Sequence, residues 1–471
     1  MKLREIANVD SDSEVTGFAI DHRKVIGGNI FGAFKGAVFN GEDFVPEAVS
    51  RGAIAVVAQP GAKVDGVALL TDSQPRRLFA SLAAKFYGPY PETVVAVTGT
   101  NGKTSTVEMT RQIWRMLGHR SASIGTLGVT TADDQVKTGL TTPDIVTFLN
   151  NMAGLKKMGI SHVAYEASSH GLDQHRAEGV PLSAIAFTNF SRDHLDYHQT
   201  MDAYFEAKMR LFDEVIEPGK PAVIWSDDPK SGEVIERARR RGLDVMTVGR
   251  KGDTIRLVEQ TPTSLGQTLM LQHGSKRYQL ALPLIGAYQA ANVMAAAGLV
   301  LATGGEWDRV FASMARVSPV RGRLERAVIS RTGAPVYVDY AHTPDALEAA
   351  IQALKPHVHG RLITVFGAGG DRDQGKRAPM GEVATKLSDV AIVTDDNPRS
   401  EDPALIRAAI LAGAAGAVEV PGRKEAIARA LEMAREGDII LLAGKGHETG
   451  QIVGDRILPF DDAEVARECA A

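Results

Sequence analysis

A short run of glycine, lysine and threonine residues gives the first indication of chemistry in this sequence. Residues 99–104 read Gly-Thr-Asn-Gly-Lys-Thr and directly follow an apolar run. The backbone N–H groups of such a turn can surround phosphate oxygens, and the start of a following helix adds positive potential. Lys103 would contribute a point charge, and the Thr104 hydroxyl is placed to bind Mg²⁺. The segment therefore predicts a site for nucleotide phosphates.

The loop departs from the Walker form G-x-x-x-x-G-K-[ST], because Val97 stands where that pattern has its first glycine. Its context supports a phosphate loop nonetheless. A β-forming run precedes it, and Val107, Ile113, Trp114 and Leu117 recur behind it at roughly helical spacing. The competing interpretation is an ordinary strand-to-helix turn in a glycine-rich chain.

Two further candidates lie at the ends of predicted strands. Glu166 follows the apolar run HVAY, and His194 lies just past AIAFTNF. In an open parallel sheet, ligands gather at the carboxyl ends of the strands, so both side chains are expected near the phosphate loop. Mg²⁺ prefers oxygen, which makes Glu166 a plausible ligand and His194 a less usual one. The alternative for His194 is that it caps the helix that begins in SRDHLDYH.

Lys208 has an unusual position for a lysine. In MDAYFEAKMRLFDEV, Phe205 and Phe212 are three and four residues away, so helical spacing puts Lys208 on the apolar face. A lysine in that position can extend its amine to solvent along the apolar surface. The functional alternative is reaction with CO₂, which converts the amine to a carbamate and so replaces a buried cation by an oxygen ligand for a second Mg²⁺.

Composition limits the class of protein. The chain has 471 residues, 44% of them apolar, which is enough for about three domains with cores of their own. The net charge of −4 and the lack of a long basic stripe argue against nucleic acid as the main partner. A single cysteine, Cys469, excludes an intramolecular disulfide framework and a Cys₄ zinc site. With no secretory signal and no apolar run long enough for a membrane helix, we expect a soluble cytoplasmic enzyme.

Strands alternate with helices along the whole chain, which is typical of parallel α/β sheets. The first portion extends to about Tyr90 and holds GFAIDHRKVIGGNIFGAFKG and GAIAVVAQ. The second begins with the strand of the phosphate loop and continues through HVAYE, AIAF and PAVIW. The third begins near GRLERAVIS and repeats the pattern with RLITVF, DVAIV and DIILLAG. We therefore predict domains at 1–90, 91–320 and 321–471.

Eleven motifs together resemble those of the Mur ligases, in the order of that family. They are TGTNGKTST, TTPD, YEASSHGLDQHR, TNFSRDHLDYH, the helix with Lys208, LIGAYQAAN, GRLE, VDYAHTPDAL, FGAGGDRDQGKR, DNPRSEDP and GKGHE. The resemblance covers essentially the whole chain. It implies an α/β fold with an N-terminal UDP-binding α/β domain, a central parallel-sheet P-loop ATPase domain and a C-terminal Rossmann-like domain that binds an amino acid.

The motif set is most similar to that of Mur ligases that join meso-diaminopimelate to UDP-N-acetylmuramoyl-L-alanyl-D-glutamate. The resemblance implies that ATP phosphorylates the γ-carboxylate of D-glutamate, and that the amine of diaminopimelate then displaces phosphate from the acyl phosphate. It also implies ATP and Mg²⁺ as cofactors and carbamylation of Lys208. We expect the protein to act as a monomer. Its partners would be these small molecules, with no nucleic acid and no membrane span.

The matching motif positions give the expected site residues. Those expected to bind ATP are Gly99, Thr100, Asn101, Gly102, Lys103, Thr104, Asn292, Arg323 and Asp339. Those expected to hold Mg²⁺ are Thr104, Glu166, His194 and Lys208 as its carbamate, and the expected catalytic set is Lys103, Glu166, His194 and Lys208. Those expected to bind the UDP-sugar dipeptide are His22, Thr141, Thr142, Ser168, Gln174 and Arg176. Those expected to bind diaminopimelate are Arg372, Asp396, Asn397, Pro398, Arg399, Gly444 and Glu448.

Arg399 indicates which amino acid is added. Diaminopimelate carries a second carboxylate at the far end of its side chain, and the planar guanidinium group of arginine matches a carboxylate with two parallel hydrogen bonds. Lysine would bring an ammonium group to the same place, so we expect it to be rejected. The alternative is that Arg399 caps its own loop by pairing with Glu401 or Asp402.

Three positions depart from the Mur ligase pattern. His22 replaces a serine that would contact the UDP moiety, Gln289 replaces a second asparagine near the nucleotide, and Asn29 replaces an aspartate. Two other functions share part of the pattern. Folylpolyglutamate synthetase has the loop and the lysine, although TTPD, SSHGLDQHR and DNPR argue against it. A non-enzymatic NTP-dependent switch would hydrolyse slowly and would need neither a carboxylate nor an amine, so phosphate release with each acceptor set separates the three.

Overall fold

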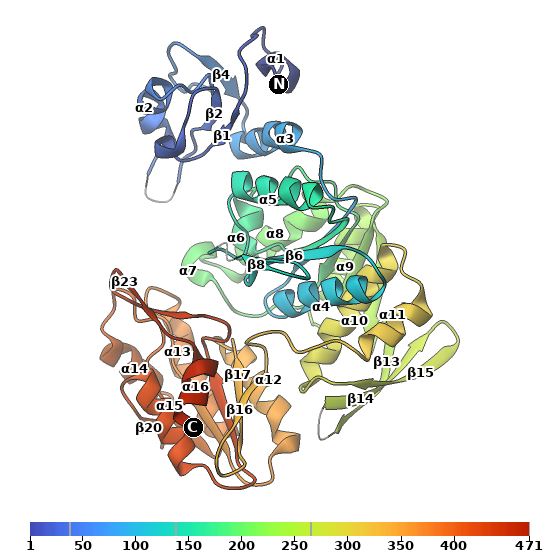
Figure 1. Cartoon of the computed structure of the whole chain (residues 1–471), viewed down its shortest axis with the longest axis vertical. Helices are drawn as coiled ribbons and strands as arrows, with labels where there is room; N and C mark the ends of the chain where they lie inside the picture. Colours follow the sequence, from blue (N-terminus) through green and yellow to red (C-terminus); the bar gives the residue numbers. More distant parts are fainter. Residues whose placement is uncertain (37–38, 137–138, 264–265, 471) are drawn as a thin grey trace.

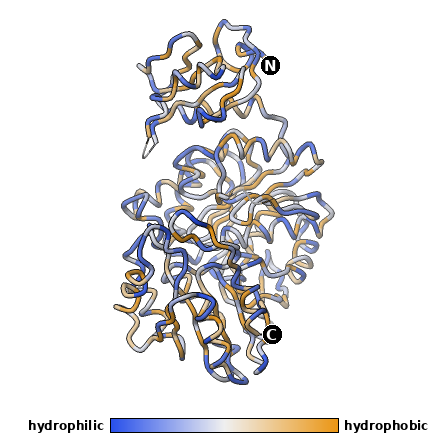
Figure 2. The backbone as a smooth tube through the Cα atoms, turned by 60° about the vertical axis from the view of Figure 1, so that its left-hand side comes forward, coloured by the Kyte–Doolittle hydropathy of each residue, from blue (hydrophilic) through white to orange (hydrophobic). Residues whose placement is uncertain are grey.

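Three main β-sheets, each with its own helices, follow one another along the chain (Figure 1). The computed structural model describes residues 1–36, 39–136, 139–263 and 266–470. Figures 1 and 2 both show the first sheet and its helices at one end of the molecule, joined to the rest by the chain that follows α3 (Pro75–Tyr87). The expected α/β fold in three domains is confirmed.

The first domain contains a four-stranded parallel sheet in the order β1-β2-β3-β4. Its strands are β1 (Gly17–Ala19), β2 (Asn29–Gly32), β3 (Ala55–Ala58) and β4 (Ala68–Thr71), and its helices are α1 (Leu3–Ile6), α2 (Val45–Ser50) and α3. Strands β1 to β3 are buried along their whole length, as expected of parallel strands covered on both faces. Helix α3 contacts both this sheet and α5 (Ile145–Lys157), and so connects the first domain to the central one.

The central domain is built on an eleven-stranded sheet in the order β15-β14-β13-β12-β11-β10-β5-β9-β6-β7-β8. Its strands are β5 (Thr93–Thr98), β6 (Ser121–Gly125), β7 (Gly128–Thr130), β8 (Gln135–Val136), β9 (His162–Glu166), β10 (Ala184–Phe187), β11 (Pro221–Trp225), β12 (Asp244–Gly249), β13 (Ile255–Thr263), β14 (Gly266–His273) and β15 (Lys276–Leu282). Its helices are α4 (Lys103–Met116), α5, α6 (Ser169–Asp173), α7 (Leu195–His198), α8 (Met201–Arg210), α9 (Ser231–Arg240), α10 (Ala287–Ala302) and α11 (Trp307–Met314). Strand β5 lies between β10 and β9, so the ends of these three strands meet beside the phosphate loop.

The two edges of the central sheet differ from the expected parallel arrangement. Strands β13, β14 and β15 pair antiparallel in the order of the chain, as do β6, β7 and β8. Side chains of β14 and β15 alternate between buried and less buried positions, and Leu269, Leu271, Leu280 and Leu282 pack into the same core as α10. Antiparallel neighbours need no crossover helix between them, and such strands can leave one face of the sheet uncovered, so this part of the chain has strands in succession instead of a strand–helix alternation.

The C-terminal domain contains a six-stranded sheet in the order β16-β17-β21-β18-β19-β20, of which only β16 is antiparallel. Its strands are β16 (Glu325–Ile329), β17 (Pro335–Asp339), β18 (Leu362–Phe366), β19 (Val390–Val393), β20 (Val418–Glu419) and β21 (Ile439–Ala443), followed by the hairpin β22 (Gly450–Val453) and β23 (Arg456–Pro459). Its helices are α12 (Pro344–Leu354), α13 (Arg377–Leu387), α14 (Pro403–Leu411), α15 (Arg423–Met433) and α16 (Asp462–Ala470). Separate apolar clusters cover the two faces of the sheet, as in a doubly wound fold.

Short helical turns complete the three domains. They are η1 (His22–Lys24), η2 (Gly41–Phe44), the π-helical turn η3 (Leu211–Val215), η4 (Lys355–His357) and η5 (Gln374–Lys376). Among the helices of the described ranges, none has the length and apolar character needed to cross a membrane.

A fully buried ion pair joins α15 to α16 in the C-terminal domain. Arg423 Nε and Nη2 donate to the two carboxylate oxygens of Asp462 at 2.7 and 2.6 Å, and both side chains are 0% exposed. Arg423 Nη2 also donates to Ala443 O at 2.9 Å, at the end of β21. Removing one partner leaves the other charge buried and unpaired, which typically costs far more than the pair contributes.

We therefore expect Asp462→Ala to lower the stability of the C-terminal domain by about 3–5 kcal/mol, because it leaves the Arg423 guanidinium group buried without its anion. The measurement is thermal unfolding followed by calorimetry. The control is Lys424→Ala, which breaks an exposed pair with Glu468 on the same two helices and should cost less than about 1 kcal/mol. Equal shifts for the two variants would show that burial does not control the effect.

Candidate active site

The predicted phosphate loop joins the end of β5 to the start of α4 and lines a cavity of about 570 Å³. Helix α4 has no side-chain cap, and its N-cap is Gly102, whose φ of 84° lies in the left-handed region. A side chain at this position would be strained, and its Cβ would clash with Asn292 Oδ1. The first turn of α4 therefore presents uncapped N–H groups at the cavity, an arrangement suited to binding phosphate.

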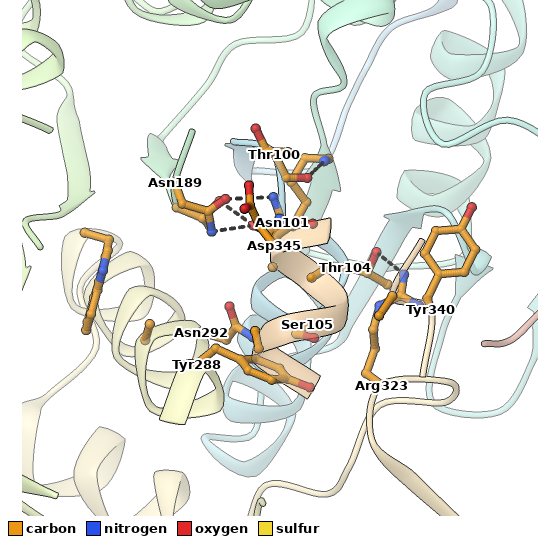
Figure 3. A pocket seen from close by; sticks show the side chains of 18 of the residues that line it. Thr100, Asn101, Thr104, Ser105, Asn189, Tyr288, Asn292, Arg323, Tyr340 and Asp345 are labelled. Atoms are coloured by element: carbon orange, nitrogen blue, oxygen red, sulfur yellow. Dashed lines mark hydrogen bonds between the residues drawn. The ribbon is translucent and has the colours of Figure 1, made fainter. Parts of the chain in front are cut away.

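Asn189, just beyond the neighbouring strand β10, holds the loop in place (Figure 3). Its Oδ1 accepts a hydrogen bond from Asn101 N at 2.8 Å, and its Nδ2 donates to Asn101 O at 3.0 Å. Thr188 Oγ1 donates to the same carbonyl at 2.7 Å, and the Tyr204 hydroxyl donates to Thr100 Oγ1 at 3.2 Å. The sequence pattern did not single out Asn189. The available signal was its place directly after the apolar run AIAF.

Lys103 lies on the loop itself. Its Nζ donates to Gly99 O at 3.0 Å and to Thr100 O at 2.8 Å, and the residue lines the cavity. Burial lowers the pKa of this ammonium group, against the opposing effect of Glu166 and Asp193. Because a carbonyl has only a partial charge, a phosphate oxygen would be a stronger partner for Lys103 than either backbone group.

The C-terminal domain provides the opposite wall of the cavity. Arg323 Nη2 donates to Thr104 Oγ1 at 3.1 Å, and the guanidinium carbon lies 4.5 Å from the centre of the Tyr340 ring (Figure 3). Asp339, at the end of β17, accepts hydrogen bonds from two backbone N–H groups at 2.8 and 2.9 Å, and burial raises its pKa. The structure thus brings Arg323 and Asp339 to the phosphate loop, as the sequence predicted. Their contact with ATP stays a prediction.

Asn292 and Gln289 lie on α10, beside the loop. Asn292 Nδ2 donates to Gln289 Oε1 at 3.0 Å, and Gln289 Nε2 donates to Arg323 O at 3.4 Å. The cavity next to them has apolar walls from β13 and α10, which suit the flat face of a base. Gln289, one of the departures from the family pattern, therefore orients the predicted adenine-side asparagine.

Glu166 ends β9 with its side chain directed at the turn after β6. Its Oε1 accepts from Thr126 N at 2.7 Å and its Oε2 accepts from the Thr126 hydroxyl at 3.2 Å. The Thr126 hydroxyl lies 3.5 Å from that of Thr104, so oxygen atoms connect Glu166 to the end of the phosphate loop. Thr126 was missed by the sequence analysis, because nothing in its local spacing marks it.

His194 is the N-cap residue of α7, but its side chain makes no capping hydrogen bond. His194 therefore occupies the N-cap position that the alternative gave it, but its ring does not cap the helix. Burial lowers the pKa of His194 to about 3, so the imidazole is neutral near pH 7 and keeps a lone pair for a ligand. Asp193 lies beside it, with 3.5 Å between Asp193 Oδ2 and His194 Nε2.

Lys208 is 1% exposed, so its amine does not extend to solvent and that alternative is also wrong. Its Nζ donates to Gly99 O at 2.7 Å and lies 4.4 Å from the centre of the Tyr204 ring. Burial, together with the charge of Lys103, holds the pKa of Lys208 well below its usual range. Within the described parts of the chain, no carboxylate forms an ion pair with it.

The predicted metal ligands divide into two groups. Thr104 and Glu166 offer oxygen atoms beside the phosphate loop, which is the donor type that Mg²⁺ prefers. His194 lines the same cavity, whereas Lys208 lies behind the loop, and both side chains lie near the ring of Tyr204. Among residues 1–36, 39–136, 139–263 and 266–470, no group of three or more His, Cys, Asp or Glu side chains could hold a metal by itself. The oxygen atoms of Thr104 and Glu166 fit Mg²⁺ as they are. The second group would supply an oxygen ligand only after Lys208 is converted to its carbamate.

Four of the residues predicted to bind the dipeptide form one hydrogen-bonded cluster. Thr142 Oγ1 donates to Glu166 O at 2.8 Å and lies 2.9 Å from Ser168 Oγ. Arg176 donates to Thr142 O at 3.3 Å and, through Nε and Nη2, to Gln174 Oε1 at 3.0 and 2.6 Å. The cluster begins at the carboxyl end of β9, so it adjoins the phosphate loop.

The other two residues of this predicted set lie apart from the cluster. The Thr141 hydroxyl is 3.2 Å from that of Thr126. His22 lies in the first domain, where its ring stacks on Phe44 with 4.3 Å between centroids and its Nε2 lies 3.4 Å from Glu47. The structure therefore does not bring His22 together with the rest of the set.

The residues predicted to bind diaminopimelate gather around the loop after β19. Asn397 Nδ2 donates to Glu448 Oε2 at 2.8 Å, and a Cβ on Gly444 would lie 2.7 Å from Asp396 Oδ2. Arg399 Nη1 donates to Gly370 O at 2.7 Å. The Arg372 side chain lies beside it, since a Cβ on Gly369 would contact both arginines.

Arg399 does not cap its loop through an ion pair. Glu401 pairs with Arg377 at 2.8 Å, and Asp402 caps α14 by accepting from Ala404 N at 2.8 Å. Arg399 forms no ion pair with a described residue, so that alternative is wrong. Within the described ranges, its guanidinium group donates only to the carbonyl oxygens of Gly370 and Asn397.

A second cavity, of about 320 Å³, connects the two sets of residues. Asn397 and Glu448 line it, and Thr126, Thr141 and Tyr340 line both this cavity and the first. A phosphate group on the loop and an amino acid beside Asn397 would therefore face each other across one junction between the central and C-terminal domains.

Known proteins provide an independent test of the family. The family model described as the Mur ligase middle domain matches residues 97–300, and the one described as the Mur ligase glutamate ligase domain matches residues 322–446. The chain belongs to the Mur ligase family. A Zymomonas mobilis relative named UDP-N-acetylmuramoyl-L-alanyl-D-glutamate–2,6-diaminopimelate ligase is 56% identical over 98% of this chain and 95% of its own length. A Bradyrhizobium diazoefficiens relative of the same name is 50% identical over 100% of this chain and 99% of its own length.

Solved structures agree with this assignment. A structure of a UDP-N-acetylmuramoyl-L-alanyl-D-glutamate–2,6-diaminopimelate ligase matches this Mur ligase with a TM-score of 0.72 and 31% identity, over 100% of this chain and 98% of that one. A MurF ligase from Thermotoga maritima, in complex with ADP, matches with a TM-score of 0.64 and 20% identity, over 97% of both chains. The second similarity supports the fold alone.

We expect Gly102→Ala to weaken ATP binding by at least about tenfold, because alanine at this φ costs roughly 1–2 kcal/mol and its Cβ would displace Asn292. Titration calorimetry with ATP measures the loss. The control is Gly118→Ala, since Gly118 has a φ of 94° and open space around its Cβ position. An equal loss in both variants would show that backbone strain alone, and not the geometry at Asn292, is responsible.

Proposed function

We propose that this Mur ligase joins meso-diaminopimelate to the γ-carboxylate of D-glutamate in UDP-N-acetylmuramoyl-L-alanyl-D-glutamate, with conversion of ATP to ADP and phosphate. The product is the UDP-N-acetylmuramoyl tripeptide used in peptidoglycan synthesis. The observation that carries the proposal is the pair of adjoining cavities, which share Thr126, Thr141 and Tyr340. The names of relatives that are 56% and 50% identical over nearly the whole chain support the same substrates.

The reaction has two steps in which bonds form and break at one carboxylate. First, a γ-carboxylate oxygen attacks the terminal phosphorus of ATP, and ADP leaves with the electrons of the broken P–O bond. Next, the amine nitrogen attacks the acyl carbon, the tetrahedral intermediate expels phosphate, and the nitrogen loses a proton. Neither partner is very reactive, so much of the rate enhancement would come from alignment.

The chain supplies that alignment from three sides. The phosphate loop, Lys103 and Arg323 would hold the phosphates of ATP on the wall between the domains. The cluster around Thr142 and Arg176 would hold the dipeptide, with its γ-carboxylate at the end of β9. Asn397 and the rest of the loop after β19 would present the amino acid from the opposite side.

Mg²⁺ would be held by Thr104 and Glu166 at one position and by His194 and carbamylated Lys208 at another. When bound, it would shield the negative charges of ATP and of the acyl phosphate. Carbamylation requires a neutral amine, whose nitrogen adds to the carbon of CO₂ and then releases a proton to give the carbamate. Burial favours the neutral amine of Lys208, and its Nζ lies against the back of the phosphate loop.

The three domains divide the substrates in this proposal. Residues 1–90 would hold the UDP end of the nucleotide sugar with His22. Residues 91–320 would bind ATP and the dipeptide, and residues 321–471 would bind the amino acid. The enzyme would act as a monomer in the cytoplasm, where ATP and nucleotide sugars are made. Phosphate release that required folate and glutamate, or that required no acceptor at all, would instead support a folylpolyglutamate synthetase or a nucleotide-dependent switch.

We expect wild-type protein to prefer meso-diaminopimelate over L-lysine by a factor of up to about 10⁴ in kcat/KM, because lysine would leave the Arg399 guanidinium group without its carboxylate. Arg399→Ala should remove most of this preference. Coupled phosphate release with each amino acid provides the measurement. Arg429→Ala, at an exposed arginine of the same domain, should leave the preference unchanged. Wild-type use of L-lysine, or an Arg399→Ala variant that keeps its preference, would contradict the assignment.

We expect Lys208→Ala to lower kcat by orders of magnitude, because it removes the amine that becomes the carbamate. Added bicarbonate or a short carboxylate should partly restore the rate by supplying oxygen atoms in the space left by the side chain. The exposed Lys230, which lies over the ring of Phe205, provides the control Lys230→Ala. A Lys208→Ala variant with near wild-type activity would contradict the role of Lys208 as a carbamate. An inactive variant that is not rescued would indicate that Lys208 only supports Gly99 structurally.

A further inference from the structure

Lys445 is a buried lysine that neither the proposed reaction nor the predicted site residues use. It follows β21, and its side chain is 0% exposed. Its Nζ donates to Asn397 Oδ1 at 3.0 Å and to Glu448 Oε2 at 3.1 Å, and lies 3.8 Å from Asp396 Oδ1. Because a buried ammonium group is costly unless it is paired, these acceptors are what allow the lysine to be there.

The contacts of Lys445 determine how Asn397 is oriented. Lys445 Nζ and the N–H of Ile452, at 3.0 Å, donate to the same side-chain atom of Asn397, which must be the amide oxygen because an amide nitrogen accepts no such bond. The amide nitrogen consequently faces Glu448 and donates to its Oε2 at 2.8 Å. This bond uses one of the two N–H groups of the amide, and the second has no acceptor among the described residues.

Glu448 is oriented by the same contacts. Its Oε2 accepts from both Asn397 and Lys445, whereas its Oε1 forms no hydrogen bond within the described parts of the chain. Asn397 and Glu448 line the second cavity, and Lys445 lies behind them. One amide N–H and one carboxylate oxygen are therefore left for a ligand. This pair of groups suits a carboxylate and an ammonium group, the two ends of an amino acid.

We propose that Lys445 is a positioning residue for the amino-acid substrate, which holds Asn397 and Glu448 in the orientation that receives one carboxylate and one ammonium group without touching the substrate itself. The inference rests on the proposed function. The charge of Lys445 also separates the carboxylates of Asp396 and Glu448, which would otherwise repel each other.

The test is Lys445→Met in the full-length protein. The methionine nearly keeps the length of the side chain and removes its charge and both of its hydrogen bonds, to Asn397 and to Glu448. KM for meso-diaminopimelate should rise by about 10- to 100-fold, by analogy with the losses found when a residue that orients a metal-binding side chain is removed. KM for ATP and for the nucleotide-sugar dipeptide should stay within about twofold. Lys445→Gln keeps an amide NH₂ as a donor without the charge and should give a smaller rise, and it supplies the same comparison if the methionine variant does not fold. The matched control is Lys424→Met, which removes an exposed lysine that also pairs with a glutamate, at 3.1 Å.

A double-mutant comparison shows whether Lys445 acts through Glu448. If it does, Glu448→Gln combined with Lys445→Met should raise KM for meso-diaminopimelate by less than the product of the two single effects, since only the part that acts through Asn397 is left to lose. Independent, multiplying effects, an unchanged KM in Lys445→Met, or a parallel rise in KM for ATP would each overturn the positioning role. Wild-type protein that releases no phosphate in response to meso-diaminopimelate would overturn the proposed function itself, and that outcome is separate because it requires no variant.

Discussion

Two lysine amines, that of the partly buried Lys103 and that of the fully buried Lys208, share one carbonyl oxygen at the centre of this Mur ligase. Lys103 Nζ and Lys208 Nζ donate to Gly99 O at 3.0 and 2.7 Å. Neither lysine forms an ion pair with a carboxylate among the described residues. Burial disfavours the positive charge on each amine. Two ammonium groups that donate to the same carbonyl oxygen also repel each other, and the repulsion is strong in a medium of low dielectric constant. The arrangement therefore favours one neutral amine, or anions close to both.

The proposed chemistry would place negative charge at each of the two amines. Phosphate on the loop would pair with Lys103, while a carbamate would give Lys208 a negative charge and turn its repulsion from Lys103 into attraction. His194 is neutral and adds no further positive charge to this cavity. The uncapped start of α4, the Asn189 contacts and the wall formed by Arg323 then all serve the same requirement, which is to hold negative charge at the carboxyl end of β5.

Local periodicity was sufficient to predict the parallel core and the face of α8 on which Lys208 lies. Since the ends of neighbouring parallel strands meet at one edge, Glu166 could be placed beside the phosphate loop before the fold was known. The antiparallel strands β13 to β15 were not recognised, because their alternating pattern was interpreted within the strand–helix alternation of the rest. Asn189 and Lys445 were missed for a different reason: their roles depend on partners 88 and 48 residues away, and no local spacing records such contacts.

Gln289 connects two parts of the enzyme that are usually considered separately. Its side chain accepts from Asn292 on the base side of the cavity and donates to Arg323 O, in the segment where the chain leaves the central domain. The extra methylene of glutamine, compared with asparagine, gives it the reach to do both. A single amide therefore links the wall of the cavity beside α10 to the backbone of the segment that leads into the C-terminal domain, so a group that displaces Asn292 would also disturb the hydrogen bond to Arg323 O.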